Sequence, residues 1–172
     1  MEPDKIYFDM DGVLADFTLG VKEMCGIDID TPQEQRSKEQ DKAMFDAIHE
    51  VPDFYLKLKT IPGTVDLFYR LRELYGDKVE VLTGIPKPER NIPTASDEKI
   101  SWVRDHLEGD IVVNTVLRSE KKNYVKGEGS ILIDDLPSNI KAWEECGGTG
   151  ILFKDPESAE RMLEELGVLP ED

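Results

Sequence analysis

The sequence has few cysteines and histidines and no long apolar run. Its 172 residues include two cysteines and two histidines. Cys25 and Cys146 stand far apart, which excludes a disulfide scaffold and a closely spaced Cys/His metal site, so we expect two free thiols and a cytoplasmic location. No apolar stretch approaches the roughly 18 residues of a membrane span. The first residues are too acidic, and their apolar stretch too short, for a signal peptide. We therefore expect no membrane association.

Positive charge is also scarce. Lys and Arg number 21 against 37 Asp and Glu, a formal net charge of −16. Such a surface repels a phosphate polymer, so the composition argues against a DNA or RNA partner. A small phosphorylated ligand stays possible, because one local cationic pocket can outweigh a distant field. The length fits one domain with a small insert, and 39% hydrophobic residues suffice for a core.

Short apolar runs alternate with amphipathic segments along the chain. Runs of this kind, bounded by polar residues, predict central strands of a parallel sheet; they cover residues 6–8, 79–82, 111–113, 131–133 and 150–153. Apolar residues at helical spacing predict helices over 64–75, 97–107, 137–146 and 156–166, with Ser96 as an N-cap. This alternation is typical of an α/β fold with a doubly wound parallel sheet.

Residues 18–60 break the alternation. They contain no convincing strand, a polar and helix-friendly stretch over 30–40, and a short apolar stripe of Met44, Phe45 and Ile48. We expect an α/β core of residues 1–17 and 61–172 and a small helical cap insert of residues 18–60. Ligands of open α/β sheets bind beside the carboxyl ends of the strands, which favours a cap there over a decorative pair of surface helices.

The first predicted strand ends in two carboxylates and a glycine, Asp9, Asp11 and Gly12. Alternation along a strand would point both side chains the same way, and Gly12 lets the chain turn sharply beside a ligand. Paired carboxylates are hard oxygen ligands that suit Mg²⁺. An EF-hand calcium loop does not fit, because its glycine and glutamate would stand elsewhere.

A second strand ends in the adjacent acids Asp134 and Asp135. Neighbouring aspartates repel each other unless a cation or hydrogen bonds offset their charge. If the two strands are neighbours in the sheet, four carboxylates meet at one edge. A bound metal explains that density better than a structural role does.

A third strand ends in Thr83 and Gly84, whose hydroxyl and backbone N–H groups could hold a phosphoryl oxygen. A plain Thr-Gly turn is the alternative. Lys99 falls in the first turn of the helix predicted over 97–107, where a cation opposes the helix dipole, which favours a role toward a ligand. Lys121 and Lys122 precede the Asp134 strand and are rival candidates for the active-site cation.

Taken in order, these motifs resemble the haloacid dehalogenase (HAD) phosphohydrolase superfamily. The motifs DMDGVLADF, VLTG, a lysine and LIDD span residues 6–135. Three further features are similar to the 5′(3′)-deoxyribonucleotidases: Pro62-Gly63, EKISWV over 98–103 and SEKK over 119–122. The resemblance weakens within 18–60 and after Asp135, where that family often has an arginine and this chain has Leu136.

The resemblance implies a HAD-like Rossmannoid core and a phosphoenzyme mechanism. Asp9 would attack phosphorus to form an aspartyl-phosphate, and Asp11 would act as general acid and then as base. Mg²⁺ would bind the Asp9 carboxylate, the Asp11 backbone carbonyl and an acid of the second pair. The family pattern favours Asp135, with Asp134 close by.

The resemblance also implies which residues bind the phosphate and the rest of the substrate. Thr83 and Gly84 would bind phosphoryl oxygens, and Lys99 would offset charge at the aspartyl-phosphate. Phe17 would line the base or sugar pocket, and Lys121 or Lys122 would touch substrate. Phe54 and Tyr55 could add stacking surface, although core packing explains each aromatic equally well.

The sequence thus predicts a Mg²⁺-dependent phosphatase for a small phosphate monoester, with a nucleoside monophosphate as the expected substrate. Three alternatives stay open: a HAD phosphatase for a phosphosugar or a phosphorylated amino acid, a HAD phosphotransferase that passes the phosphoryl group to an alcohol, and a catalytically silent, metal-binding regulatory domain. A dehalogenase is disfavoured, because a halide leaving group needs no proton from Asp11.

Overall fold

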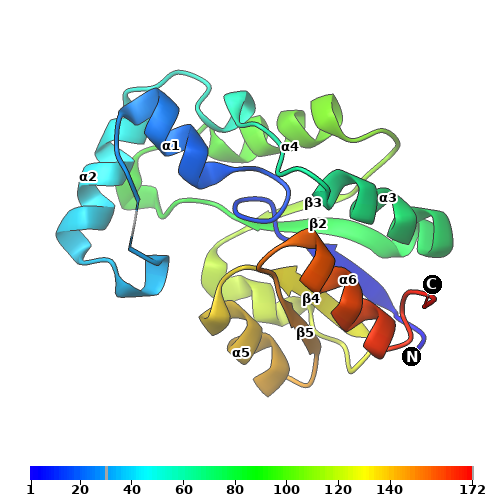
Figure 1. Ribbon diagram of the computed structural model, residues 1–172. Helices are drawn as coiled ribbons and strands as arrows, with labels where there is room; N and C mark the ends of the chain where they lie inside the picture. The colour runs from blue at the N-terminus through cyan, green and yellow to red at the C-terminus, as the bar shows by residue number, and fades with distance from the viewer. Residues whose placement is uncertain (30, 172) are drawn as a thin grey trace.

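A computed structural model describes residues 1–29 and 31–171 of the chain (Figure 1). Asp30, the first residue of the polar stretch predicted over 30–40, and Asp172 lie outside the described residues.

The core is a sheet of five parallel strands. In chain order they are β1 (Lys5–Phe8), β2 (Val79–Gly84), β3 (Val113–Val116), β4 (Ser130–Asp134) and β5 (Thr149–Leu152). The spatial order is β3-β2-β1-β4-β5, so β1 lies in the centre with β2 and β4 as its neighbours. The strand order reverses direction at β1, which confirms the predicted doubly wound sheet and places a ligand crevice at the carboxyl ends of these strands.

Alternating side chains of the strands pack against two layers of helices. Ile6 and Phe8 of β1 face α3 (Thr64–Tyr75), α4 (Ala95–His106) and α6 (Pro156–Glu165). Tyr7 points to the opposite face, where Trp143 of α5 (Pro137–Glu145) lies. Figure 1 shows α5 and α6 on opposite sides of the sheet. Helices on both faces bury the central strands completely, which is why those strands consist of nearly continuous apolar runs.

The segment between β1 and α3 carries the helices α1 (Phe17–Cys25) and α2 (Lys38–His49), which pack on each other (Figure 1). Two 3₁₀ turns, Gln33–Gln35 and Tyr55–Lys57, complete it, and the structure describes no strand within residues 18–29 and 31–60. Its two ends run side by side through hydrogen bonds of 2.8 Å from Asp16 N to Lys59 O and from Ile61 N to Leu14 O.

Two details differ from the sequence predictions. The third strand begins at Val113 rather than 111, because pairing with β2 starts at Val81–Val113; Val112, the residue before the strand, is 53% exposed. Helix α4 begins at Ala95 after Thr94, so the prediction of Ser96 as N-cap is wrong. The Ser96 hydroxyl instead lies 2.7 Å from Thr115 Oγ1 on β3. Lys99 consequently falls in the second turn of α4, not the first.

Among the described residues, no helix is both long and apolar enough to cross a membrane.

The packing of α3 generates a stability prediction. Phe68 is fully buried and meets Phe8 edge-on with ring centroids 5.0 Å apart. Phe68→Ala should lower the free energy of unfolding by about 3–5 kcal/mol, through lost transfer energy and a cavity. Leu74→Ala, at a half-exposed position of the same helix, should change it by less than about 0.5 kcal/mol. Urea denaturation measures both, and equal losses would contradict this description of the core.

Candidate active site

A cavity opens at the carboxyl edge of the sheet, where β1, β2 and β4 end. The core contributes its acidic floor and the segment over residues 17–55 contributes an opposite wall that is mainly aromatic and apolar. The residues used below that line it are Asp9, Asp11, Phe17, Arg36, Phe45, Tyr55, Gly84, Arg118, Lys121, Asp134, Asp135 and Asn139.

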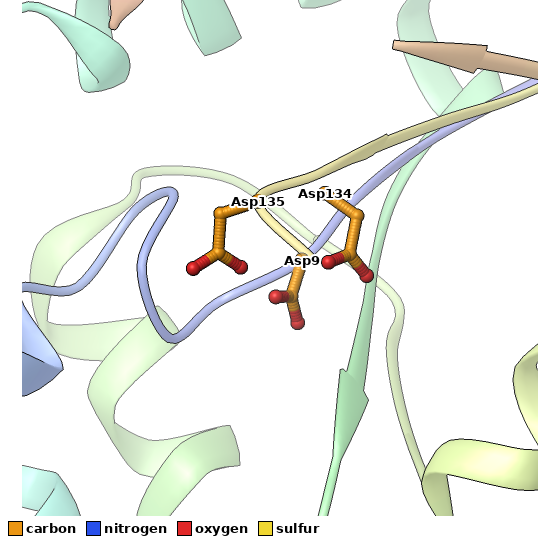
Figure 2. Close-up of side chains that lie close together, drawn as sticks. All are labelled: Asp9, Asp134 and Asp135. Carbon is orange, nitrogen blue, oxygen red and sulfur yellow. The ribbon is translucent and has the colours of Figure 1, made fainter. Parts of the chain in front are cut away.

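Three carboxylates meet on this floor. Asp9 follows β1 and Asp134 ends β4, and because Phe8 pairs with Ile133 in the parallel ladder, the two acids reach the edge at the same level. Asp135 is the next residue, and Figure 2 shows its side chain beside the other two. One oxygen from each of Asp9, Asp134 and Asp135 lies within 4.8 Å of the others.

Gly12 makes the close approach of the β1 loop to Asp135 possible. Its φ is +84°, a conformation that residues with a Cβ rarely adopt. A Cβ built at this position would lie 2.1 Å from Asp135 Oδ2. Any side chain here would therefore strain the turn and displace the carboxylate.

Lys121 joins two of the acids. It lies on the 3₁₀ segment Arg118–Tyr124, and its Nζ donates to Asp9 Oδ1 at 2.9 Å and to Asp134 Oδ2 at 2.8 Å. Burial lowers the pKa of Lys121, but the two carboxylates outweigh this and raise it above its usual value. Lys121 is therefore a permanent buried cation beside Asp9.

Lys99 serves the other acid of the β1 loop. Its Nζ donates to Asp11 Oδ2 at 2.8 Å, to Gly84 O at 2.6 Å and to Thr83 Oγ1 at 3.1 Å. The ring of Tyr55 covers the same ammonium group at 4.8 Å, a cation–π contact. Thr83 is fully buried, and its hydroxyl accepts from Lys99, so the structure places Thr83 against the lysine while Gly84 lines the cavity.

The structure thus places the three candidate lysines in different positions. Lys121 is beside Asp9, and Lys99 is beside Asp11. Lys122 is exposed and does not line the cavity.

The two acids of the second pair differ in their hydrogen bonds. Asp134 is fully buried; it accepts from Leu136 N at 2.9 Å, from Asn139 Nδ2 at 3.0 Å and from Lys121. Asp135 is reachable from solvent and has no cationic partner among residues 1–29 and 31–171. Asp11 Oδ1 is buried, and within the same described residues it has no hydrogen-bond partner.

Electrostatics at the floor favour protonation. Burial, and next the charge of Asp134, raise the pKa of Asp9 to about 7, against the pull of Lys121. Burial, followed by Asp9 and Asp134, raises the pKa of Asp135 to about 8. A lone lysine does not neutralise this cluster. Three clustered carboxylates, one of them without a cationic partner in the described part of the chain, are hard oxygen ligands that fit a divalent cation.

The wall opposite the floor is aromatic. Phe17, at the start of α1, meets Phe54 edge-on at 5.7 Å and lies over Tyr55 at 6.4 Å. Helix α4 fixes this wall through two buried hydrogen bonds, from Tyr55 N to Glu98 Oε1 (3.1 Å) and from Trp102 Nε1 to the carbonyl of residue 58 (2.7 Å).

The segment also contacts the core on both sides of the cavity. Glu34 accepts from Ser138 N at the start of α5, at 2.6 Å. On the other side Arg90 lies over the ring of Phe45, 5.1 Å from its centroid. The segment therefore bounds the cavity on the side opposite the acidic floor.

Sequence reasoning missed four polar residues of the cavity: Gln33, Arg36, Arg118 and Asn139. Asn139 lies in the first turn of the helix after the Asp134 strand, so its place at the same edge could have been inferred from helical spacing. Arg36 and Arg118 stand in polar stretches that look like ordinary solvated surface, and nothing in their spacing marks them.

Solved structures share this fold. The chain superimposes on a HAD-superfamily hydrolase of Ehrlichia chaffeensis with a TM-score of 0.52 and 14% identity, covering 96% of this chain and 98% of that one. A HAD family hydrolase of Deinococcus radiodurans, solved with bound phosphate and sodium, gives a TM-score of 0.51 and 15% identity, covering 99% of each chain.

Sequence relatives define the chemistry more closely. The cytosolic type of 5′(3′)-deoxyribonucleotidase of Homo sapiens is 30% identical over 156 residues, covering 82% of this chain and 74% of that protein. The mitochondrial 5′(3′)-deoxyribonucleotidase of Mus musculus is 29% identical over 166 residues, covering 87% and 72%. Together with the fold and the acidic site, these relatives define a phosphoric monoester hydrolase of the HAD superfamily.

The family can be stated more narrowly. The profile of the family described as 5′ nucleotidase, deoxy (pyrimidine), cytosolic type C protein matches residues 4–165. This chain belongs to that family.

The raised pKa values generate a prediction about stability in chelator. The native state holds protons on Asp9 and Asp135 that the unfolded chain releases near its ordinary carboxyl pKa of about 4, so stability must fall as pH rises toward 7 and 8. Asp135→Asn should reduce that fall between about pH 5 and pH 8 by about 1 kcal/mol, after allowance for solvent screening.

Urea denaturation at the two pH values measures the effect. Asp110→Asn, at an exposed acid away from the cavity, is the matched control and should keep the wild-type slope. An Asp135→Asn slope equal to that of the control would show that Asp135 titrates normally in the native state.

Proposed function

We propose that this protein hydrolyses nucleoside monophosphates by a Mg²⁺-dependent reaction through an aspartyl-phosphate on Asp9. The observation that carries the proposal is the acidic cluster at the ends of β1 and β4 with Lys121 set between Asp9 and Asp134. The deoxyribonucleotidase activity named for the relatives supports the choice of substrate.

Asp9 is suited to be the nucleophile. The Lys121 ammonium donates to Oδ1 and fixes the orientation of the carboxylate. This leaves Oδ2 as the oxygen that would attack a substrate in the cavity. Attack of this oxygen on phosphorus forms the acyl phosphate, and the alkoxide of the substrate leaves. Lys121 then offsets the negative charge gathered around Asp9 and the transferred phosphoryl group.

Asp11 is suited to move the proton. Lys99 holds its Oδ2, while its Oδ1 has no partner in the described part of the chain. We assign to Oδ1 the proton that the leaving oxygen takes up, and afterwards the proton of the water that hydrolyses the acyl phosphate. Lys99 is in this scheme a positioning residue for Asp11, braced by Thr83 and Gly84.

Asp9, Asp135 and the backbone carbonyl of Asp11 would hold Mg²⁺. The ion would supply the charge neutralisation that lets one anion approach another. Asp135 suits direct ligation because no lysine or arginine of the described residues pairs with it. Asp134 suits a supporting place, because its oxygens are taken up by Lys121, Leu136 N and Asn139.

Residues 18–60 act in this proposal as a cap insert on a core of residues 1–17 and 61–172. Their paired stems and their contacts on both sides of the cavity support that division. The aromatic wall of Phe17 and Tyr55 favours a flat base over a phosphosugar as the leaving group. Two unpaired thiols and the cytosolic type of one relative support a cytoplasmic location.

Phosphate release from paired substrates tests the proposal. Wild-type protein with Mg²⁺ should hydrolyse nucleoside monophosphates in preference to sugar phosphates and phosphorylated amino acids, and chelator should abolish release. Asp9→Asn should lower kcat by on the order of 10³-fold or more, because the nucleophile is lost. Release by Asp9→Asn at the wild-type rate would refute the mechanism, and preference for another ester would refute the substrate assignment.

The two lysines should be separable by leaving group. p-Nitrophenol leaves without a proton, so Lys99→Met, which disturbs the proton donor Asp11, should slow the first burst of p-nitrophenol, the phosphorylation step, far less than it slows the first release of nucleoside from a nucleotide. Lys121→Met should lower kcat on both substrates alike, by on the order of 10²-fold, because it disturbs the nucleophile. Circular dichroism checks that both variants fold. The reverse pattern would exchange the roles of the two lysines. The same pattern for both variants would refute the assignment of separate roles.

A further inference from the structure

One arginine of the cap insert faces the cavity and has no place in the proposed reaction. Arg36 follows the 3₁₀ turn Gln33–Gln35 and lines the cavity whose floor holds Asp9 and Asp11. Its side chain is only 11% exposed. An arginine this enclosed is unusual in a cavity wall that is otherwise mainly aromatic and apolar.

Arg36 is fixed in place by a neighbour of the same insert. Its Nε donates to Asp41 Oδ1 at 2.8 Å, and Asp41 lies in the first turn of α2. That bond uses one of the five N–H donors of the guanidinium. Within residues 1–29 and 31–171, the two terminal nitrogens of Arg36 have no hydrogen-bond partner.

The fixed orientation matters because it leaves the terminal N–H groups of Arg36 available to a ligand in the cavity. The carboxylates of the floor do not accept from these groups: Lys121 takes Asp9 and Asp134, and Lys99 takes Asp11. These lysines already offset charge at the phosphate end of the cavity. Arg36 comes from the cap insert, which forms the opposite wall, so its donors are placed for the part of a substrate remote from the phosphate.

We infer that Arg36 is a specificity-determining residue whose terminal N–H groups donate to an acceptor atom on the nucleobase of the substrate. The inference deepens the proposed function and rests on it. Arginine carries donors only, so its partner must be a carbonyl oxygen or an unprotonated ring nitrogen. The half-buried ring of Phe17 in the same wall suits the face of such a base, while Arg36 suits its edge.

Two substrates that differ only in the base test the inference. Deoxyuridine monophosphate has the acceptor-bearing base, and 2-deoxyribose 5-phosphate has the same sugar and phosphate without it. Arg36→Met should lower kcat/KM for the nucleotide by about tenfold or more, mainly through KM, the loss expected for a hydrogen bond to a charged donor. It should leave kcat/KM for the sugar phosphate within about twofold of wild type.

Two further variants complete the test. Arg36→Lys keeps the charge without the planar fork and should recover part of the nucleotide activity. Arg104→Met, at an exposed position of α4 outside the cavity, is the matched control and should behave as wild type on both substrates. The sugar phosphate activity of each variant also reports that the protein is folded.

The outcomes separate this inference from the proposed function. Equal losses on both substrates would place Arg36 at the sugar or phosphate and overturn the inference, as would no loss on either. Wild-type protein that hydrolyses the sugar phosphate but not the nucleotide would overturn the nucleotidase proposal itself, before any Arg36 variant is compared.

Discussion

The site depends on the ion triplet in which the Lys121 ammonium lies between Asp9 and Asp134. Neighbouring parallel strands bring these acids to the same level, and their mutual repulsion would oppose folding without a cation between them. Lys121 comes from the 3₁₀ segment that precedes β4. The strand order that brings the two acids together therefore also brings the lysine between them. Asp135 adds a third acid, which the triplet does not neutralise.

From this constraint the division of the site follows. The floor pairs each acid of the β1 loop with its own lysine, Asp9 with Lys121 and Asp11 with Lys99. The two pairs suit two different steps, attack on phosphorus and transfer of a proton. The four carboxylates of the floor outnumber these two lysines, so the approach of an anionic substrate would depend on the divalent cation that the acids would hold.

Much of this arrangement could be predicted from the sequence. Apolar runs that end in acids predicted β1, β4 and their common edge, and the wound sheet follows from the alternation of strands and helices. The choice between Lys99 and Lys121 could not be made, because it depends on how a 3₁₀ segment turns one side chain inward and leaves Lys122 outside. Arg36 was missed for a similar reason. A polar stretch predicts exposed side chains, and only the structure shows that Asp41 holds Arg36 in the cavity wall. The start of β3 was missed because apolar content alone does not show which valine pairs first.

The central claim is that the carboxylate held by Lys121 is the nucleophile. The most direct test mixes Asp11→Asn protein with p-nitrophenyl phosphate and Mg²⁺, quenches the reaction in acid and maps the phosphorylated peptide by mass spectrometry. Without its base, this variant should hydrolyse the acyl phosphate slowly and accumulate it. The account predicts a phosphoryl group on Asp9, absent when Asp9 is also changed to Asn. Phosphoryl transfer to another residue, or turnover of p-nitrophenyl phosphate by the double variant, would contradict it.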